Sequence, residues 1–118
     1  MKKLLLLLLI VLLSPNIYAK ATVEGTITYL NTGKCYEIQM TWYSGREARQ
    51  TFDDWQQYDS IYDYAIVYWG NNEATVLEVE DSICGGECSG NDLPMEPVIG
   101  IDRDDNEWLI EVGSLAYC

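Results

Sequence analysis

The stretch 61–84, IYDYAIVYWGNNEATVLEVEDSIC, decides the fold. β-Branched and aromatic residues dominate its two arms, 61–69 and 74–80, as they do in β-strands. Residues 70–73 between the arms are Gly-Asn-Asn-Glu, and glycine and asparagine supply the backbone freedom that a tight reversal needs. The stretch therefore predicts a central β-hairpin that leads directly to a close pair of cysteines.

Two further hairpins are predicted on either side of the central one. Residues 22–30 and 35–42 alternate between apolar and polar side chains across a turn, and we expect Trp42 to face the core. Residues 98–102 and 107–112 alternate in the same way. Six to seven short strands in one chain predict an all-β, mainly antiparallel fold, either a small sandwich or a closed barrel.

The segment 45–58 fits two structures. Residues 44–47, Ser-Gly-Arg-Glu, match a helix capping box, and apolar side chains recur at helical spacing over 48–55. Residues 47–52 also alternate as a strand would. We favour the strand, because the neighbouring segments are strands and a meander needs only short connections, and keep a short helix as the alternative.

The first residues have the layout of a secretory signal peptide. Lys2 and Lys3 precede an unbroken apolar run at 4–13, which a polar break and a small residue follow. The run is shorter than the roughly 20 residues that a membrane-spanning helix needs. We therefore expect a signal peptide at 1–19, with cleavage possible as late as residue 21.

Removal of the signal peptide would leave one β domain at 20–118, which we expect to be secreted or periplasmic, without stable membrane insertion. The even number of cysteines predicts disulfides in that oxidising environment. Cys84 and Cys88 could close on each other, but we favour a distant partner for each, with the other two cysteines supplying those partners. The four candidate disulfide residues are Cys35, Cys84, Cys88 and Cys118.

A zinc site is the rival interpretation of the four cysteines. Zinc sites usually take their ligands from two close pairs, and this chain has one such pair. A redox-active Cys-x-x-Cys motif is absent, because three residues separate Cys84 from Cys88. The pattern favours disulfides over a metal, and we predict no cofactor.

The chain is strongly acidic. It has 19 Asp and Glu residues against 7 Lys and Arg, and its formal charge of −12 becomes −14 when Lys2 and Lys3 leave with the signal peptide. This charge disfavours nucleic acid and anionic membranes as partners and favours a cationic protein, or solubility without a partner.

Composition also excludes several catalytic chemistries. The chain has no histidine, so Ser-His-Asp and Cys-His catalysis are ruled out, and no phosphate-binding glycine motif occurs. Paired carboxylates could hydrolyse a glycosidic bond. In so acidic a chain, however, the presence of two carboxylates does not indicate a glycosidase. We predict no catalytic residues and no enzymatic activity.

Residues 102–106 have the 1,3,5 spacing of oxygen ligands in a calcium loop, with Asp102, Asp104 and Asn106 as candidate ligands. The sixth position is Glu107 where such loops need glycine, and the twelfth is Gly113 where they have a bidentate glutamate. An acidic hairpin turn is therefore favoured over a calcium site.

A row of tyrosines is the candidate binding surface. Odd-numbered Ile61, Ala65 and Val67 are expected to face the core, which leaves even-numbered tyrosines on the opposite face. Such a row either binds a partner or is covered by another part of the chain. The candidate binding residues are Tyr62, Tyr64, Tyr68, Asp59 and Asp63.

Three functions remain open. The leading one is a small exported acidic binding protein that recognises or inhibits a basic secreted protein. The alternatives are a carbohydrate-binding module whose surface Trp and Tyr rings stack on a polysaccharide, and a structural, surface-associated domain without a soluble ligand.

Overall fold

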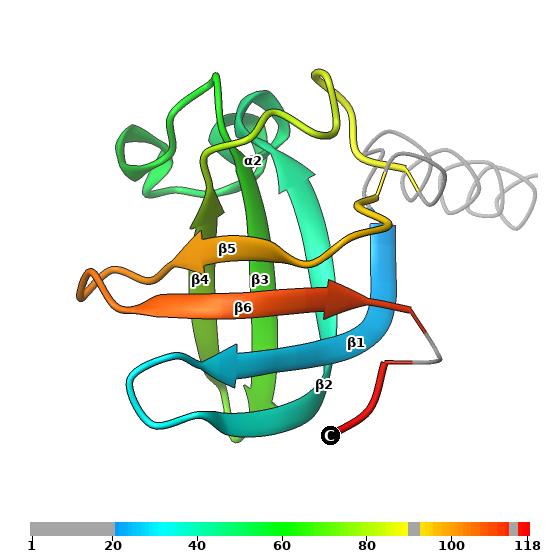
Figure 1. Ribbon diagram of the computed structural model, residues 1–118. Coiled ribbons are helices and arrows are strands. Elements are labelled where there is room, and N and C mark those ends of the chain that lie inside the picture. The colour runs from blue at the N-terminus through cyan, green and yellow to red at the C-terminus, as the bar shows by residue number, and fades with distance from the viewer. Residues whose placement is uncertain (1–20, 90–92, 114–115) are drawn as a thin grey trace, which may run out of the picture.

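A computed structural model describes residues 21–89, 93–113 and 116–118 (Figure 1). The expected signal peptide lies outside these residues. Each strand pairs antiparallel with the next, and the first pairs with the last, so the described strands form a closed barrel. Of the two architectures expected from the sequence, a small sandwich and a closed barrel, the structure has the barrel. The strands are β1 (Ala21–Tyr29), β2 (Lys34–Ser44), β3 (Asp63–Gly70), β4 (Glu73–Val79), β5 (Val98–Ile101) and β6 (Glu107–Val112).

The strands of the barrel lie in two layers that cross. In Figure 1, β2, β3 and β4 run up and down, and β1, β5 and β6 cross in front of them. The apolar sides of both layers meet inside, and Trp42 is fully buried there, as the alternation in 35–42 predicts. Inside the barrel Trp42 packs among Ile27, Met40, Ala65, Val67, Leu77, Val79, Cys84, Cys88 and Ile110.

Segment 45–58 begins as helix α2 (Gly45–Thr51) and continues into the short 3-10 helix η1 (Trp55–Gln57), so the strand favoured from the sequence is wrong. The capping box decides the outcome locally. The Glu47 N–H donates to Ser44 Oγ at 3.1 Å, and the Ser44 N–H donates to Glu47 Oε1 at 2.9 Å. These two bonds satisfy backbone groups that a helix start would otherwise leave unpaired.

The helical segment creates a second apolar cluster outside the barrel. Its buried members are Tyr43, Ala48, Tyr58, Tyr64 and Ile66, which come from β2, α2, β3 and the end of η1. The outer face of β2 and β3 is therefore covered by α2 and by Phe52 and Tyr58, which lie on either side of η1 in the chain.

The disulfides differ from the favoured pairing. Cys84 bonds to Cys88, and Cys35 bonds to Cys118. The short loop can close because Gly85 and Gly86 take positive φ angles of 63° and 115°, which glycine adopts readily. The long bridge ties the start of β2 to the C-terminal residue.

The central hairpin begins later than the sequence suggests. β3 starts at Asp63, and Ile61, expected in the core, is 61% exposed. The turn has the predicted chemistry, with Asn71 and Asn72 at φ 54° and 63°. Asparagine tolerates this conformation better than most residues do.

Substituting Gly45 tests the packing of α2. A Cβ there would collide with the backbone carbonyl oxygens of Asp59 and Tyr62. Helix propensity alone predicts that Gly45→Ala stabilises the protein. We expect the opposite, a loss of about 1–3 kcal/mol in the free energy of unfolding, as overpacking costs. Urea unfolding measures it, with Gln50→Ala on the same helix as control; a Gly45→Ala variant as stable as wild type would contradict this packing.

Candidate functional site

The tyrosine row does not form one exposed face. Tyr64 is 2% exposed and Asp63 1%, whereas Tyr68 is 51% exposed. Tyr62 is half-buried and Asp59 is exposed. The candidate binding surface is thus corrected, because α2 and the Tyr58 side chain cover the middle of the row.

The polar atoms of Tyr64 are used inside the protein. Its hydroxyl accepts a hydrogen bond from the Asp59 N–H and donates to Glu78 Oε1 at 3.0 Å. Burial raises the pKa of Tyr64, and the nearby Glu78 carboxylate raises this pKa further. The hydrogen bond from the Asp59 N–H lowers it, but the net shift is upward. The phenol is therefore a protonated donor that connects the segment after η1 with β4.

The acidic turn between β5 and β6 is organised by Asp102. Its Oδ1 accepts the N–H groups of Asp104 and Asn106, each at 2.9 Å, and its Oδ2 accepts the Trp108 indole N–H at 3.0 Å. Burial acts to raise the pKa of Asp102, but the hydrogen bonds from Trp108, Asn106 and Asp104 outweigh it and the pKa is lowered. The candidate calcium residues therefore form a hairpin turn with an internal carboxylate acceptor.

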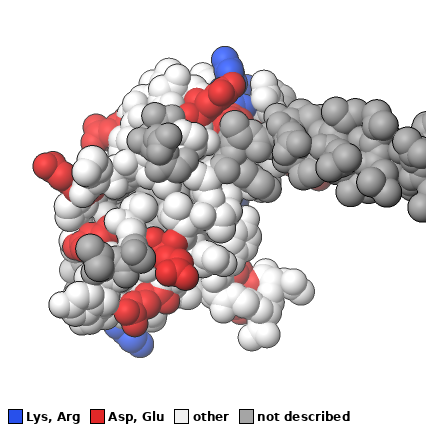
Figure 2. Space-filling model, turned by 90° about the vertical axis from the view of Figure 1, so that its right-hand side faces the viewer, with Lys and Arg blue, Asp and Glu red and all other residues white. Residues whose placement is uncertain are grey.

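Few of the carboxylates are matched by a positive charge. Two ion pairs occur among the described residues, Arg46 with Glu87 at 3.7 Å and Arg103 with Asp54 at 2.9 Å. The Arg49 guanidinium stacks on the Trp55 ring at 4.6 Å. On the face in Figure 2, acidic side chains stand in several groups, and basic ones appear only near the upper and lower edges. The surface charge is thus largely uncompensated.

Part of this charge borders a hollow of about 340 Å³, which we call the acidic hollow. In the β1–β2 register Glu24 faces Gln39 and Thr26 faces Glu37. Residues two apart in a strand point the same way, so both glutamates stand on the outer face of the barrel. The hollow is lined by Glu24, Gly25, Glu37, Ile38, Gln39, Gly113 and Ala116.

A second hollow, of about 530 Å³, adjoins the first and shares Glu24 and Gly113 with it. Its lining is more apolar, and it includes the fully exposed Met95. We call it the apolar hollow; its other lining residues are Val23, Leu93, Pro94 and Val112. Sequence reasoning missed both hollows, although the polar side of the alternation in β1 and β2 was the signal for the acidic one.

Four aromatic rings gather on another part of the barrel. The ring centroids of Tyr29 and Trp108 lie 4.8 Å apart, and those of Tyr36 and Trp69 lie 5.2 Å apart. All four residues are half-buried. The Trp69 indole N–H donates to Thr75 Oγ1 at 2.7 Å, which fixes the ring. We call this group the aromatic cluster.

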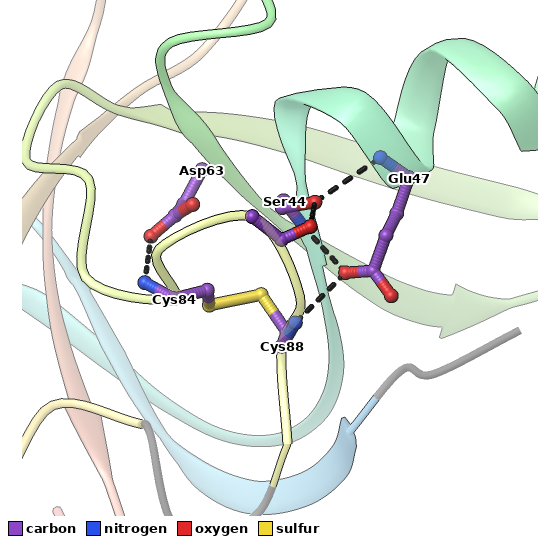
Figure 3. The surroundings of a disulfide bond; sticks show 6 residues. Ser44, Glu47, Asp63, Cys84 and Cys88 are labelled. Carbon is purple, nitrogen blue, oxygen red and sulfur yellow. Dashed lines mark hydrogen bonds between the residues drawn. A yellow bond between two sulfur atoms is a disulfide. The ribbon is translucent and has the colours of Figure 1, made fainter.

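The Cys84–Cys88 loop is held by two carboxylates, which approach it from two sides (Figure 3). The Cys84 N–H donates to Asp63 Oδ2 at 2.7 Å, and the Cys88 N–H donates to Glu47 Oε1 at 2.9 Å. Burial raises the pKa of Asp63, although hydrogen bonds from the loop backbone lower it; the Glu47 charge raises it further. The helix cap and the disulfide loop therefore share one carboxylate.

Comparison with known proteins gives no relative from which a function could be transferred. No protein-family model, no curated sequence and no solved structure matches the chain. Among the described residues, no helix is both long and apolar enough to cross a membrane.

The Asp102 turn predicts a specific acid sensitivity. A lowered pKa means that the carboxylate stabilises the fold above the ordinary value of 3.8 and loses this contribution as the pH falls through the folded-state pKa. At neutral pH Asp102→Asn should lower the free energy of unfolding by about 1–3 kcal/mol, since an amide cannot replace all the acceptors.

Urea unfolding of wild type and Asp102→Asn over a pH series checks this expectation. The difference between the two proteins should shrink as the solution is acidified below pH 3.8, the ordinary pKa of the side chain. Asp104→Asn, in the same turn, is the matched control, because the Asp104 side chain is exposed. A difference that does not change with pH would contradict the assigned role of the Asp102 carboxylate.

Proposed function

We propose that the protein is a small exported binding protein that recognises a cationic protein through the acidic hollow. The observation that carries this proposal is the pair of exposed carboxylates, Glu24 and Glu37, that line one polar hollow from neighbouring strands. Neither belongs to the two ion pairs of the described residues. A lysine or arginine side chain of a partner would supply the missing positive charge.

The adjoining apolar hollow supports a protein partner. Protein interfaces combine an apolar centre with a polar rim, and methionine is enriched in them. Met95 projects beside the apolar hollow, and Glu24 borders both hollows. A basic secreted enzyme that carries an apolar patch next to its cationic groups fits this surface, and the protein would act as its inhibitor.

The compartment agrees with an exported binding protein. Two disulfides indicate an oxidising environment outside the cytoplasm. We further propose that residues 1–19 direct export and that the mature domain acts in the periplasm or outside the cell, without catalytic activity. Its negative charge would repel nucleic acid and anionic membranes.

A basic lysozyme and a basic nuclease are suitable probes, with binding measured by biolayer interferometry. Affinity should fall steeply between about 0.1 M and 1 M salt, because the Debye length falls from about 10 Å to about 3 Å. Glu24→Gln/Glu37→Gln should weaken binding about fivefold to thirtyfold, from about 0.5–1 kcal/mol per surface charge pair.

The matched control is Glu73→Gln/Glu80→Gln, which removes the same charge at exposed positions around β4. This control should keep most of the affinity, since the lost charges lie outside both hollows. The proposal fails if neither probe binds, if binding survives high salt, or if the two double variants lose affinity equally.

The aromatic cluster supports a second candidate function, binding of a polysaccharide. Half-buried rings of fixed orientation can stack on sugar rings, and Trp69 and Trp108 lie in the cluster. In that case polysaccharides would quench tryptophan fluorescence, and Glu24→Gln/Glu37→Gln would not alter the quenching. Quenching by basic proteins alone would favour the first function.

A further inference from the structure

We propose that Cys84, Cys88 and Asp63 form a latent binding site for a thiophilic divalent cation of the zinc class, which opens when a dithiol reduces the Cys84–Cys88 disulfide. One sulfur from each cysteine and one oxygen of Asp63 lie within 4.8 Å of one another, and all three residues are buried. Two thiolates, a carboxylate and an open fourth position form a ligand set that Zn²⁺ accepts.

The electrostatics of the site point to a cation. Asp63 is 1% exposed and has backbone N–H groups as hydrogen-bond partners, but among the described residues no basic side chain pairs with it. Glu47 lies near enough to repel its charge. Two carboxylates thus converge on one loop, neither of them in an ion pair within the part of the chain that the structure describes, and Figure 3 shows the disulfide between them. A bound divalent ion would compensate this charge.

The loop is short, and its two glycines are not packed against the barrel, although Ser44 Oγ donates a hydrogen bond to the Gly86 carbonyl at 2.6 Å. Cys84 and Cys88 are four positions apart, and the Gly85-Gly86 pair between them has open space around each Cα. Opening the other disulfide instead would release the C-terminal residue from β2. The short loop is therefore the place where reduction can produce a ligand pair held on the protein.

The redox chemistry balances with a dithiol such as dithiothreitol. The dithiol donates two electrons and two protons, its own sulfurs form a cyclic disulfide, and the Cys84–Cys88 bond becomes two thiols. Binding of the metal then displaces both thiol protons to solvent, because thiolates are the metal ligands.

Cobalt(II) is the probe, because thiolate ligation gives it charge-transfer absorption in the near ultraviolet and intense visible bands. The full chain, reduced by the dithiol and then freed of it without air because the dithiol itself binds cobalt, should bind one Co²⁺ and show these bands, whereas the oxidised protein should not. Cys84→Ser/Cys88→Ser should abolish the bands, and Cys35→Ser/Cys118→Ser should keep them. Zn²⁺ should displace the cobalt and bleach the spectrum.

Asp63→Asn distinguishes a folded site from simple chelation by free thiols. It should weaken cobalt binding by about tenfold or more, as loss of a ligand or of its support does. Glu87→Gln, which removes an exposed carboxylate from the same loop, should bind as wild type does. Equal affinities for Asp63→Asn and Glu87→Gln, absence of the bands in reduced wild type, or their persistence in Cys84→Ser/Cys88→Ser would each overturn the proposal.

Discussion

Pairing of β1 with β6 is the constraint on which the rest of the structure depends. Ile27 faces Ile110 across this pair, and both side chains are fully buried. On the opposite side of the barrel, β4 and β5 share a single register pair, Glu78 with Ile101. That junction therefore contributes little backbone pairing to the closure of the barrel. Closure removes the exposed sheet edges and turns every inward side chain toward one core. It also fixes the outer face of β1, where the acidic hollow lies.

Charge and covalent cross-links act on this closed sheet in opposite directions. The chain carries a formal net charge of −12, and self-repulsion at this excess opposes compaction. The Cys35–Cys118 bridge spans 83 positions, and in the chain-entropy model a loop of that length stabilises the fold by about 4–5 kcal/mol. The same bridge holds Cys118 beside β2, close in the chain to Ala116, which lines the acidic hollow together with Gly113, whose N–H donates to the Glu24 carbonyl at 2.9 Å. The Cys35–Cys118 bridge thus helps to form the acidic hollow, which is lined by Glu24 and Glu37, two carboxylates outside the ion pairs of the described residues.

Alternation and turn chemistry predicted the three hairpins and the burial of Trp42, because strand period and turn preference are local properties. The helix at Gly45–Thr51 also has a local signal, the capping box from Ser44 to Glu47. The sequence-based choice of a strand gave more weight to the preference for short connections between strands, and that choice was wrong. The prediction of an exposed tyrosine row was wrong because burial of Tyr64 depends on tertiary packing. No residue within 61–69 indicates that α2 covers Tyr64. The disulfide pairing and both hollows depend on the register between strands and on the position of the C-terminal residues relative to β1 and β2. No single stretch of sequence determines either of these features.

The most direct test of the account is to map amide chemical shifts of the ¹⁵N-labelled mature domain during titration with a lysine-rich peptide. If the acidic hollow binds the peptide, the shifts should concentrate at Glu24, Gly25, 37–39 and the neighbouring Gly113, with little change at Tyr29 or Trp108. Shifts centred on the aromatic cluster, or spread evenly over all acidic residues, would contradict recognition of a cationic partner by the acidic hollow.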